Sequence, residues 1–255
     1  MNSVKGKSIC IFSAKGGVGK TVTAVNLAGV FSRLQKKVVI IDFDLTGGGV
    51  AAYLNKPFEK NSYNFVEDYA NNHYQSLKNY VTKFDDDIDF LASPKDPRQG
   101  TRISASYIEV ILEKATNEYD IVIVDTNHTL SEFNVTLLDK CDEVLLVVSN
   151  DMLDLKNTRN LIHIFKDAEK TNYKVMLNNS VHPSKKYYSL YDVKSMIKAN
   201  IDYLIDSSFF LKTMDQYISD GVILTKEAKM PKVYPKVYRA FLTICNDLME
   251  LEHEK

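Results

Sequence analysis

The residues best suited to chemistry lie close together at positions 14–21, Ala-Lys-Gly-Gly-Val-Gly-Lys-Thr. Three glycines within four positions let backbone N–H groups close around an anion without clashes from Cβ atoms. Lys20 would place its charge on the β- and γ-phosphates of a nucleotide, and the Thr21 hydroxyl would ligate Mg²⁺. This spacing predicts a phosphate-binding loop, although a glycine-rich turn without a ligand is the simpler alternative.

The segments on either side of this loop have the character that a phosphate site requires. A short apolar run at 9–13 precedes the loop, and a helix-like segment follows it. The order strand, glycine-rich turn, helix is the context in which such a loop binds phosphate. The helix would also direct its positive amino-terminal end at the same place.

Carboxylates follow two further apolar runs. Asp42 and Asp44 lie two positions apart at the end of one run, so the alternation of a strand would point both the same way. A carboxylate beside a phosphate loop can orient water or hold the water shell of a metal ion. A second run, 121–124, ends in Asp125, which would lie near Mg²⁺. Buried strands often end in Asp, so Asp125 is informative mainly because the phosphate loop is also present.

The sequence KGGVGKT at 15–21 resembles the deviant Walker A loop of the MinD/ParA family of P-loop ATPases, with Ala14 in place of the first glycine. In that family the extra lysine reaches across a dimer interface to the partner's nucleotide. The resemblance implies the same role for Lys15, and it implies that ATP holds two subunits together. It also implies that Asp44 positions the attacking water and that Asp42 supports the Mg²⁺ shell.

The motifs and the family resemblance together give a full set of expected site residues. We expect Lys15, Lys20 and Asp44 to be catalytic, and Thr21, Asp42 and Asp125 to serve the metal. The family often places an Asn at the sixth strand tip, where its amide binds adenine, and this implies that role for Asn178; a turn-forming Asn pair, Asn178-Asn179, is the alternative. The expected nucleotide contacts are Lys15, Gly16, Gly17, Val18, Gly19, Lys20, Thr21, Val22 and Asn178.

Some positions depart from the family pattern or have a structural interpretation. Asn127-His128 replaces the two prolines that usually follow the Asp-Thr pair, so this loop should be less rigid. His128 is interpreted as a partly exposed loop residue, with phosphate or pH sensing as the alternative. Asn26 is interpreted as structural or interfacial. Asp206 and Ser207 match the base-binding segment poorly and are not assigned.

The elements that would position these residues alternate along the chain. Continuous apolar runs are typical of a parallel sheet covered on both faces. The expected strands are 9–13, 38–43, 88–92, 121–125, 144–149, 175–178 and 201–205. The expected helices are 22–35, 104–116, 153–170, 188–199, 211–219 and 235–251, with helices and loops in 51–87. This pattern predicts an α/β fold with a doubly wound, mostly parallel sheet of about seven strands, as a single domain over 1–255.

Composition narrows the function classes. The net charge of −1 gives no global field that would favour nucleic acid or membrane. Cys10, Cys141 and Cys245 are far apart, which favours buried thiols in a reducing cytosol over a disulfide framework or an iron–sulfur site. Residues 1–7 are polar and no apolar stretch reaches the length of a membrane span, so we expect a cytoplasmic protein.

Partners and cargo are less constrained than the nucleotide site. Membrane-bound relatives end in a basic amphipathic helix, whereas residues 250–254 of this chain are rich in acids. We therefore do not expect the tail to bind a membrane. A basic stretch is a candidate DNA or partner patch, or simply a solvated helix entrance: Lys226, Lys229, Lys232, Lys236 and Arg239. The acid run 85–87 is interpreted as a solvated turn. The strand and proline turn at 90–97 resembles the CpaE/TadZ pilus-assembly group.

We therefore expect a slow, partner-stimulated ATP hydrolase that dimerises with ATP and positions a cargo, by DNA partitioning or by polar or pilus-assembly localisation. Two alternatives stay open. One is a metabolic P-loop ligase of dethiobiotin-synthetase type, against which Lys15 argues. The other is a nucleotide-binding module without hydrolysis, which the intact loop and carboxylates disfavour.

Overall fold

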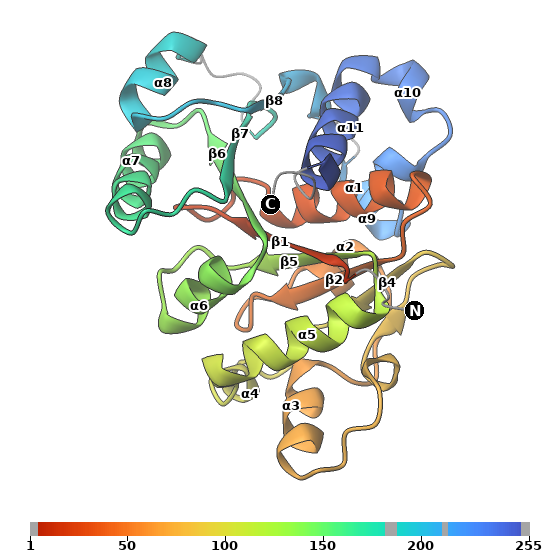
Figure 1. Cartoon of the computed structure of the whole chain (residues 1–255). Helices are drawn as coiled ribbons and strands as arrows, with labels where there is room; N and C mark the ends of the chain where they lie inside the picture. The colour runs from red at the N-terminus through yellow and green to blue at the C-terminus, as the bar shows by residue number, and fades with distance from the viewer. Residues whose placement is uncertain (1–4, 182–187, 211–213, 251–255) are drawn as a thin grey trace.

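The computed structural model describes residues 5–181, 188–210 and 214–250. These residues form one twisted sheet with helices on both faces (Figure 1). The strands are β1 (Lys7–Phe12), β2 (Val38–Phe43), β3 (Thr82–Lys83), β4 (Ile88–Leu91), β5 (Ile121–Thr126), β6 (Glu143–Ser149), β7 (Tyr173–Asn178) and β8 (Tyr203–Ile205). The helices are α1 (Lys20–Arg33), α2 (Val50–Tyr53), α3 (Ser62–Ala70), α4 (Pro97–Gly100), α5 (Ile108–Glu118), α6 (Glu132–Lys140), α7 (Met152–Asp167), α8 (Leu190–Ile197), α9 (Met214–Ser219), α10 (Met230–Val233) and α11 (Pro235–Glu250).

The strand order places β1 inside the sheet. In the described part of the chain the order is β3-β4-β2-β5-β1-β6-β7-β8, and every neighbouring pair except β3–β4 is parallel. The mostly parallel, doubly wound sheet expected from the apolar runs is thus confirmed. The one described strand beyond the seven expected is β3, which is two residues long and pairs antiparallel with β4. It is too short to give a sequence signal.

Successive side chains along the buried strands point into two different hydrophobic cores. Ile9 and Ile11 of β1 lie in one core, together with buried residues of α1 and α11. Cys10 and Phe12 of the same strand lie in the other core, which α5, α6, α7 and α8 complete. A strand that is buried on both faces must be apolar at every position, which is why these runs are continuous in the sequence.

Helix α6 was not expected from the sequence. Its apolar pattern is short, and its start depends on a local cap in which Ser131 Oγ accepts a hydrogen bond from the Asn134 N–H. Residues 51–87 do contain helix and loop, including α3, whose Phe65 packs against Tyr74 and Tyr80 with ring centroids 5.0 and 5.3 Å apart. Positions 211–213 of the expected helix 211–219 lie outside the described residues. None of the described helices is both long and apolar enough to span a membrane.

Candidate nucleotide-binding site

The predicted phosphate loop connects β1 to α1 at the carboxyl end of β1, an interior strand of the sheet. Gly17 and Gly19 have φ angles of 74° and 95°, the left-handed region that glycine enters without a Cβ penalty. Gly19 directly precedes α1, so the free N–H groups of the first helical turn lie at the loop. A Cβ built on Gly17 would meet no atom within 4 Å, so the loop leaves open space on this side.

Lys20 turns inward from the first turn of α1. It is 9% exposed, and its ammonium donates to Ser13 Oγ at 3.0 Å. Burial lowers the pKa of Lys20, and the carboxylates of Asp125 and Asp44 oppose that shift. The cation is therefore held inside the loop, at the position from which a P-loop lysine meets phosphate oxygens.

Thr21, Asp125 and Asp42 lie together at the strand ends. Thr21 Oγ1 donates to Asp125 Oδ2 at 2.6 Å, and Asp42 faces Asp125 in the register of β2 and β5. Burial raises the pKa of Asp42 to about 8 and that of Asp125 to about 6, and Asp125 adds to the shift of Asp42. Ionising both buried carboxyl groups at once is unfavourable, so the pair favours a bound cation.

Asp42 and Asp44 accept hydrogen bonds from different groups. Asp42 Oδ2 accepts from the Val50 N–H at 3.0 Å, and its Oδ1 accepts from the Asp44 N–H at 3.2 Å. Asp44 is partly exposed, and its Oδ1 accepts from Thr46 Oγ1 at 3.1 Å and from the Gly47 N–H at 3.0 Å. Asp42 therefore braces the turn after β2, and the turn fixes Asp44 at the mouth of the site.

The residues present fit magnesium and a nucleotide triphosphate. Asp125 Oδ1 is buried without a hydrogen-bond partner, which leaves an oxygen free for a ligand. No group of three or more His, Cys, Asp or Glu side chains that could hold a metal ion occurs in the described parts of the chain. Mg²⁺ suits such a site, since it is commonly held by one or two carboxylates together with substrate phosphates and waters. Thr21, Asp125 and Asp42 are the residues that would hold it.

Lys15 points away from the pocket that Lys20 fills. Its ammonium is 3.0 Å from Asp151 Oδ1, and the Lys15 side chain is 31% exposed. Asp151 is also the N-cap of α7, where it accepts hydrogen bonds from the Leu153 and Asp154 N–H groups. In this single subunit the loop lysine is thus paired within its own chain, at the rim of the site.

Asn178 contacts the loop itself. Its Nδ2 donates to the Val18 carbonyl at 3.0 Å, and its Oδ1 accepts from the Ser180 N–H at 3.0 Å and from Ser180 Oγ at 2.6 Å. A Cβ on Gly19 would lie 2.7 Å from Asn178 Nδ2. The amide therefore supports the loop, and its role toward an adenine edge stays a prediction.

A pocket of about 210 Å³ opens beside Asn178, and the sequence did not reveal it. Phe209, Phe210 and Met214 line it together with Val22 and glycines of the loop. Phe210 is 47% exposed, which is unusual for a large apolar side chain. The aromatic pair Phe209-Phe210 after β8 was the available signal. The unassigned Asp206 caps the short turn that contains Phe209, by accepting a hydrogen bond from the Ser208 N–H.

The loop after β5 is held by hydrogen bonds where relatives of the resembled family have prolines. Asn127 Oδ1 accepts from the Thr129 N–H at 3.0 Å, from Thr129 Oγ1 at 2.7 Å and from Asn134 Nδ2 at 2.7 Å. His128 is exposed, and its ring lies 3.3 Å from where a Cβ on Gly16 would be. The loop thus packs against the phosphate loop.

The remaining singled-out residues lie away from this site. Asn26 is fully buried, and its Oδ1 accepts from the Thr225 N–H at 3.2 Å, which fits a structural role. Lys226 forms an ion pair with Asp85 of the acid run, so this lysine does not contribute a free charge to the basic stretch. Lys229, Lys232, Lys236 and Arg239 are exposed.

Comparison with known proteins places this geometry in context. A sequence-family model described as an AAA domain matches residues 6–182, more than half of the chain. The chain is 23% identical to the chromosome-partitioning ATPase Soj of Thermus thermophilus over 235 residues, covering 91% of this chain and 88% of that protein.

Solved structures share the fold over nearly the whole chain. A ParA family ATPase from Chlorobium tepidum TLS superimposes with a TM-score of 0.79 at 20% identity, covering 96% of this chain and 99% of that one. The septum site-determining protein MinD from Pyrococcus horikoshii OT3, complexed with Mg-ADP, gives a TM-score of 0.77 at 17% identity, covering 97% and 98%.

Proposed function

Because this chain belongs to the MinD/ParA family of P-loop ATPases, we propose that it is an ATP-dependent dimerising switch that positions or partitions a cellular cargo. The observation that carries the proposal is the division between two lysines of one loop. Lys20 is buried inside the site, whereas Lys15 lies at its rim, where a second subunit can meet it. Family membership favours this switch over a metabolic ligase or a module without hydrolysis.

The proposed chemistry is positioning and charge compensation by the chain's own groups. Loop N–H groups and Lys20 bind the β- and γ-phosphates, and Thr21, Asp125 and Asp42 hold the metal. Bound Mg²⁺ would neutralise part of the phosphate charge. Asp44, fixed by its turn, orients the attacking water. Lys15 of each subunit leaves Asp151 and moves to the partner's phosphates.

Apolar residues around the loop support a face for a second copy. Leu130 and Ile164 line a hollow that also includes Ala14 of the loop, and they are 49% and 50% exposed. Met152 and Leu153 follow Asp151 directly and are 55% and 56% exposed. Exposed apolar patches of this kind mark protein–protein contacts. We propose that this face closes against its copy when ATP is bound.

Slow turnover in the absence of a partner protein is also part of the proposal. In the single subunit Lys15 is paired with Asp151, so one cationic group that the chemistry needs is not yet in place. A stimulating protein partner would act by favouring the closed pair. Non-specific DNA is a candidate cargo or track, and binding to a membrane through the acidic tail is not part of the proposal.

We further propose a single domain over 1–255 and a cytoplasmic location. One sheet joins the first described strand to the last, which supports a single domain. Cys10, Cys141 and Cys245 are free and buried, which suits a reducing compartment.

The test is the oligomeric state of an Asp44→Ala variant in solution. This variant should form a dimer with ATP and Mg²⁺ and stay monomeric with ADP, because hydrolysis can no longer reopen the pair. An Asp44→Ala protein that is monomeric with both nucleotides would contradict the switch. The same measurement with DNA and with lipid vesicles then asks what the dimer binds.

Lys15→Ala provides the matched second variant in the same loop. It should lose ATP turnover while it keeps most of its affinity for ATP, since Lys20 and the loop N–H groups are untouched. Wild-type turnover by Lys15→Ala would show that no second subunit contributes this lysine.

A further inference from the structure

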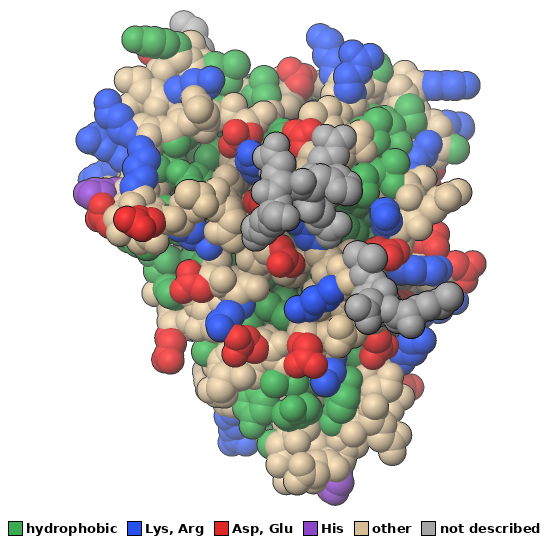
Figure 2. Space-filling model, in the orientation of Figure 1, with side chains coloured by type: hydrophobic (Ala, Val, Ile, Leu, Met, Phe, Trp, Pro, Cys, Tyr) green, Lys and Arg blue, Asp and Glu red, His purple; other side chains and the backbone are tan. Residues whose placement is uncertain are grey.

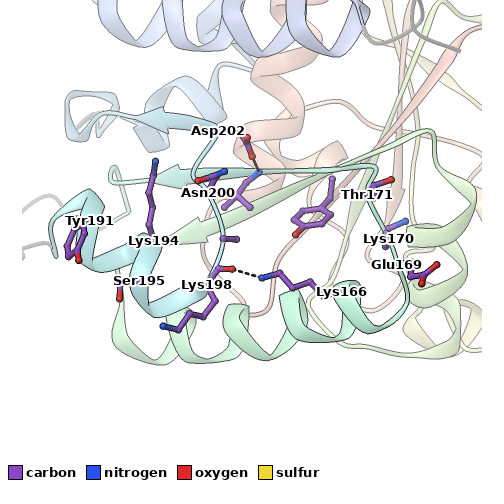
Figure 3. Close-up of a pocket in the computed structure, with 13 residues that line it drawn as sticks. Lys166, Glu169, Lys170, Thr171, Tyr191, Lys194, Ser195, Lys198, Asn200 and Asp202 are labelled. Atoms are coloured by element: carbon purple, nitrogen blue, oxygen red, sulfur yellow. Dashed lines mark hydrogen bonds between the residues drawn. The ribbon is translucent and has the colours of Figure 1, made fainter.

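A basic groove lies between α7, α8 and the first residues of β7 and β8, and its main hollow is at the opposite end of the strands from the nucleotide site. Its main hollow has a volume of about 1000 Å³, and a second hollow of about 470 Å³ continues it along α7 and shares Lys166 and Lys198 with it. Figure 3 shows the main hollow, with Lys166 and Lys198 on its helical side and Asp202 near the sheet. We call the two hollows together the basic groove.

Positive charge dominates the lining of the basic groove. Six basic side chains line it, against only two acidic ones, Glu169 and Asp202, although the whole chain has a net charge of −1. The six are Lys156, Arg159, Lys166, Lys170, Lys194 and Lys198. In Figure 2 blue side chains gather on the left of the molecule, over α7 and α8. Such a patch attracts an acidic ligand.

Two of the six cations have a structural explanation. Lys166 Nζ donates to the Lys198 carbonyl at 2.7 Å and so satisfies the end of α8. Lys170 donates to the Leu138 carbonyl and to Asn172 Oδ1. The other four make no side-chain hydrogen bond or ion pair within the described part of the chain: Lys156, Arg159, Lys194 and Lys198. These four charges are available to a ligand.

The directions of the cations favour an extended ligand over a compact anion. In Figure 3 the ammonium groups of Lys194 and Lys198 point in opposite directions. Lys156 and Arg159 lie two to three helical turns before Lys166 on α7, about 10–15 Å away along the helix axis. No single small anion reaches all of these groups, whereas an extended chain with carboxylates along its length does.

Two features favour a peptide over a nucleic acid. The carboxyl ends of α7 and α8 both border the groove, and their partial negative charge, with Glu169 and Asp202, opposes a dense row of phosphates. Sparse carboxylates on a peptide can avoid these points, and peptide N–H groups can donate to them. Tyr191, which is 80% exposed, and Tyr173 supply aromatic surface for an apolar side chain between the acids.

We propose that the basic groove binds an acidic peptide segment of a partner protein. The peptide's carboxylates pair with the four available cations, and one of its aromatic side chains packs on Tyr191. The main hollow borders the amino ends of β7 and β8, whereas the nucleotide site lies at the carboxyl ends of the strands, so this binding goes beyond the ATP switch and needs no nucleotide.

The test measures fluorescence anisotropy of a labelled Glu-Tyr-Glu repeat peptide with the full chain in the absence of nucleotide. A Gln-Tyr-Gln repeat of the same length is the neutral control, and a single-stranded oligonucleotide of equal charge is the competitor. The acidic peptide should bind at least about tenfold more tightly than the neutral one, and added salt should weaken it.

A pair of matched charge reversals locates the binding. Arg159→Glu with Lys194→Glu should weaken the acidic peptide about tenfold, whereas Lys229→Glu with Lys232→Glu, the same charge change on exposed residues near α10, should leave it unchanged. Unchanged thermal unfolding of both variants confirms that they fold.

Three outcomes would overturn the proposal. The first is equal affinity for the acidic and neutral peptides. The second is an equal loss of affinity in both charge-reversal variants, which would mean a delocalised field and no groove. The third is tighter binding of the oligonucleotide that depends on Arg159 and Lys194, which would make the surface a nucleic-acid site.

Discussion

The close packing of the Asn178 amide beside Gly19 can be tested by adding a Cβ to that glycine. Gly17 and Gly19 both have positive φ, so an alanine at either position costs about 1–2 kcal/mol of backbone strain, partly offset by about 0.4–1 kcal/mol from a less flexible unfolded chain. At Gly17 a Cβ meets no atom within 4 Å, whereas at Gly19 it lies 2.7 Å from Asn178 Nδ2. Only Gly19→Ala must therefore displace the amide.

The displaced amide sets the size of the difference. Asn178 is 4% exposed, so it has little room to move, and it would lose its 3.0 Å hydrogen bond to Val18, worth about 1 kcal/mol. Inserting a methyl group into this packed position adds a steric cost. Together, the two effects should make Gly19→Ala destabilise the nucleotide-free protein by about 1–2 kcal/mol more than Gly17→Ala. Urea unfolding of both variants measures this difference.

A double-mutant cycle tests the assignment of that difference to one contact. In an Asn178→Ala background, Gly19→Ala should cost no more than Gly17→Ala, because the obstructing amide is gone. The reasoning is wrong if the two glycine variants are equally destabilised in the wild-type background. It is also wrong if their difference survives the removal of Asn178.

Three further predictions concern the same site. Lys20→Ala should abolish both ATP binding and hydrolysis, measured by fluorescent-nucleotide titration and phosphate release, and retained turnover would contradict its placement. Phe210→Ala should raise the Kd for ATP and leave inorganic triphosphate binding unchanged in calorimetry, since Phe210 lines a pocket beside the loop; equal losses for both ligands would refute a base-binding role. Because the folded pKa of Asp42 is raised to about 8, the folded state holds this proton more tightly than the unfolded chain, whose Asp pKa is near 4. Without nucleotide, the contribution of Asp42 to the free energy of unfolding should therefore be largest at low pH and fall by up to about 1.4 kcal/mol per pH unit toward pH 8. Urea unfolding at several pH values measures this slope, and Asp42→Asn should flatten it.

The sequence was sufficient for the parts of the fold that depend on local pattern. The parallel strands are buried on both faces, so each appears as a continuous apolar run. The loop at 14–21 follows from glycine and lysine spacing alone. By contrast, β3 is only two residues long, and α6 is a nine-residue helix whose start depends on a cap formed by Ser131.

Contacts between distant parts of the chain were not predictable from the sequence. Lys15 and Asp151 are 136 positions apart, and nothing local to either residue indicates their pairing. The same holds for the basic groove, because lysines on α7 and α8 are individually typical of solvated helix faces. Phe210 follows the last strand in a segment with a poor family match, so its pocket became visible only in the folded chain.

The interior position of β1 has a consequence for how such a chain can diverge. The loop that follows β1 is framed by β5 and β6, while β3 and β8 form the rims of the sheet. Additions or losses at the β3 rim change the outline of the protein without shifting the ATP machinery, whereas the β8 rim leads into Phe210 and the pocket beside the loop. Descendants of one ancestral ATPase can therefore acquire new cargoes by remodelling the β3 edge, and comparison of close relatives should find more variation there than at the β8 edge.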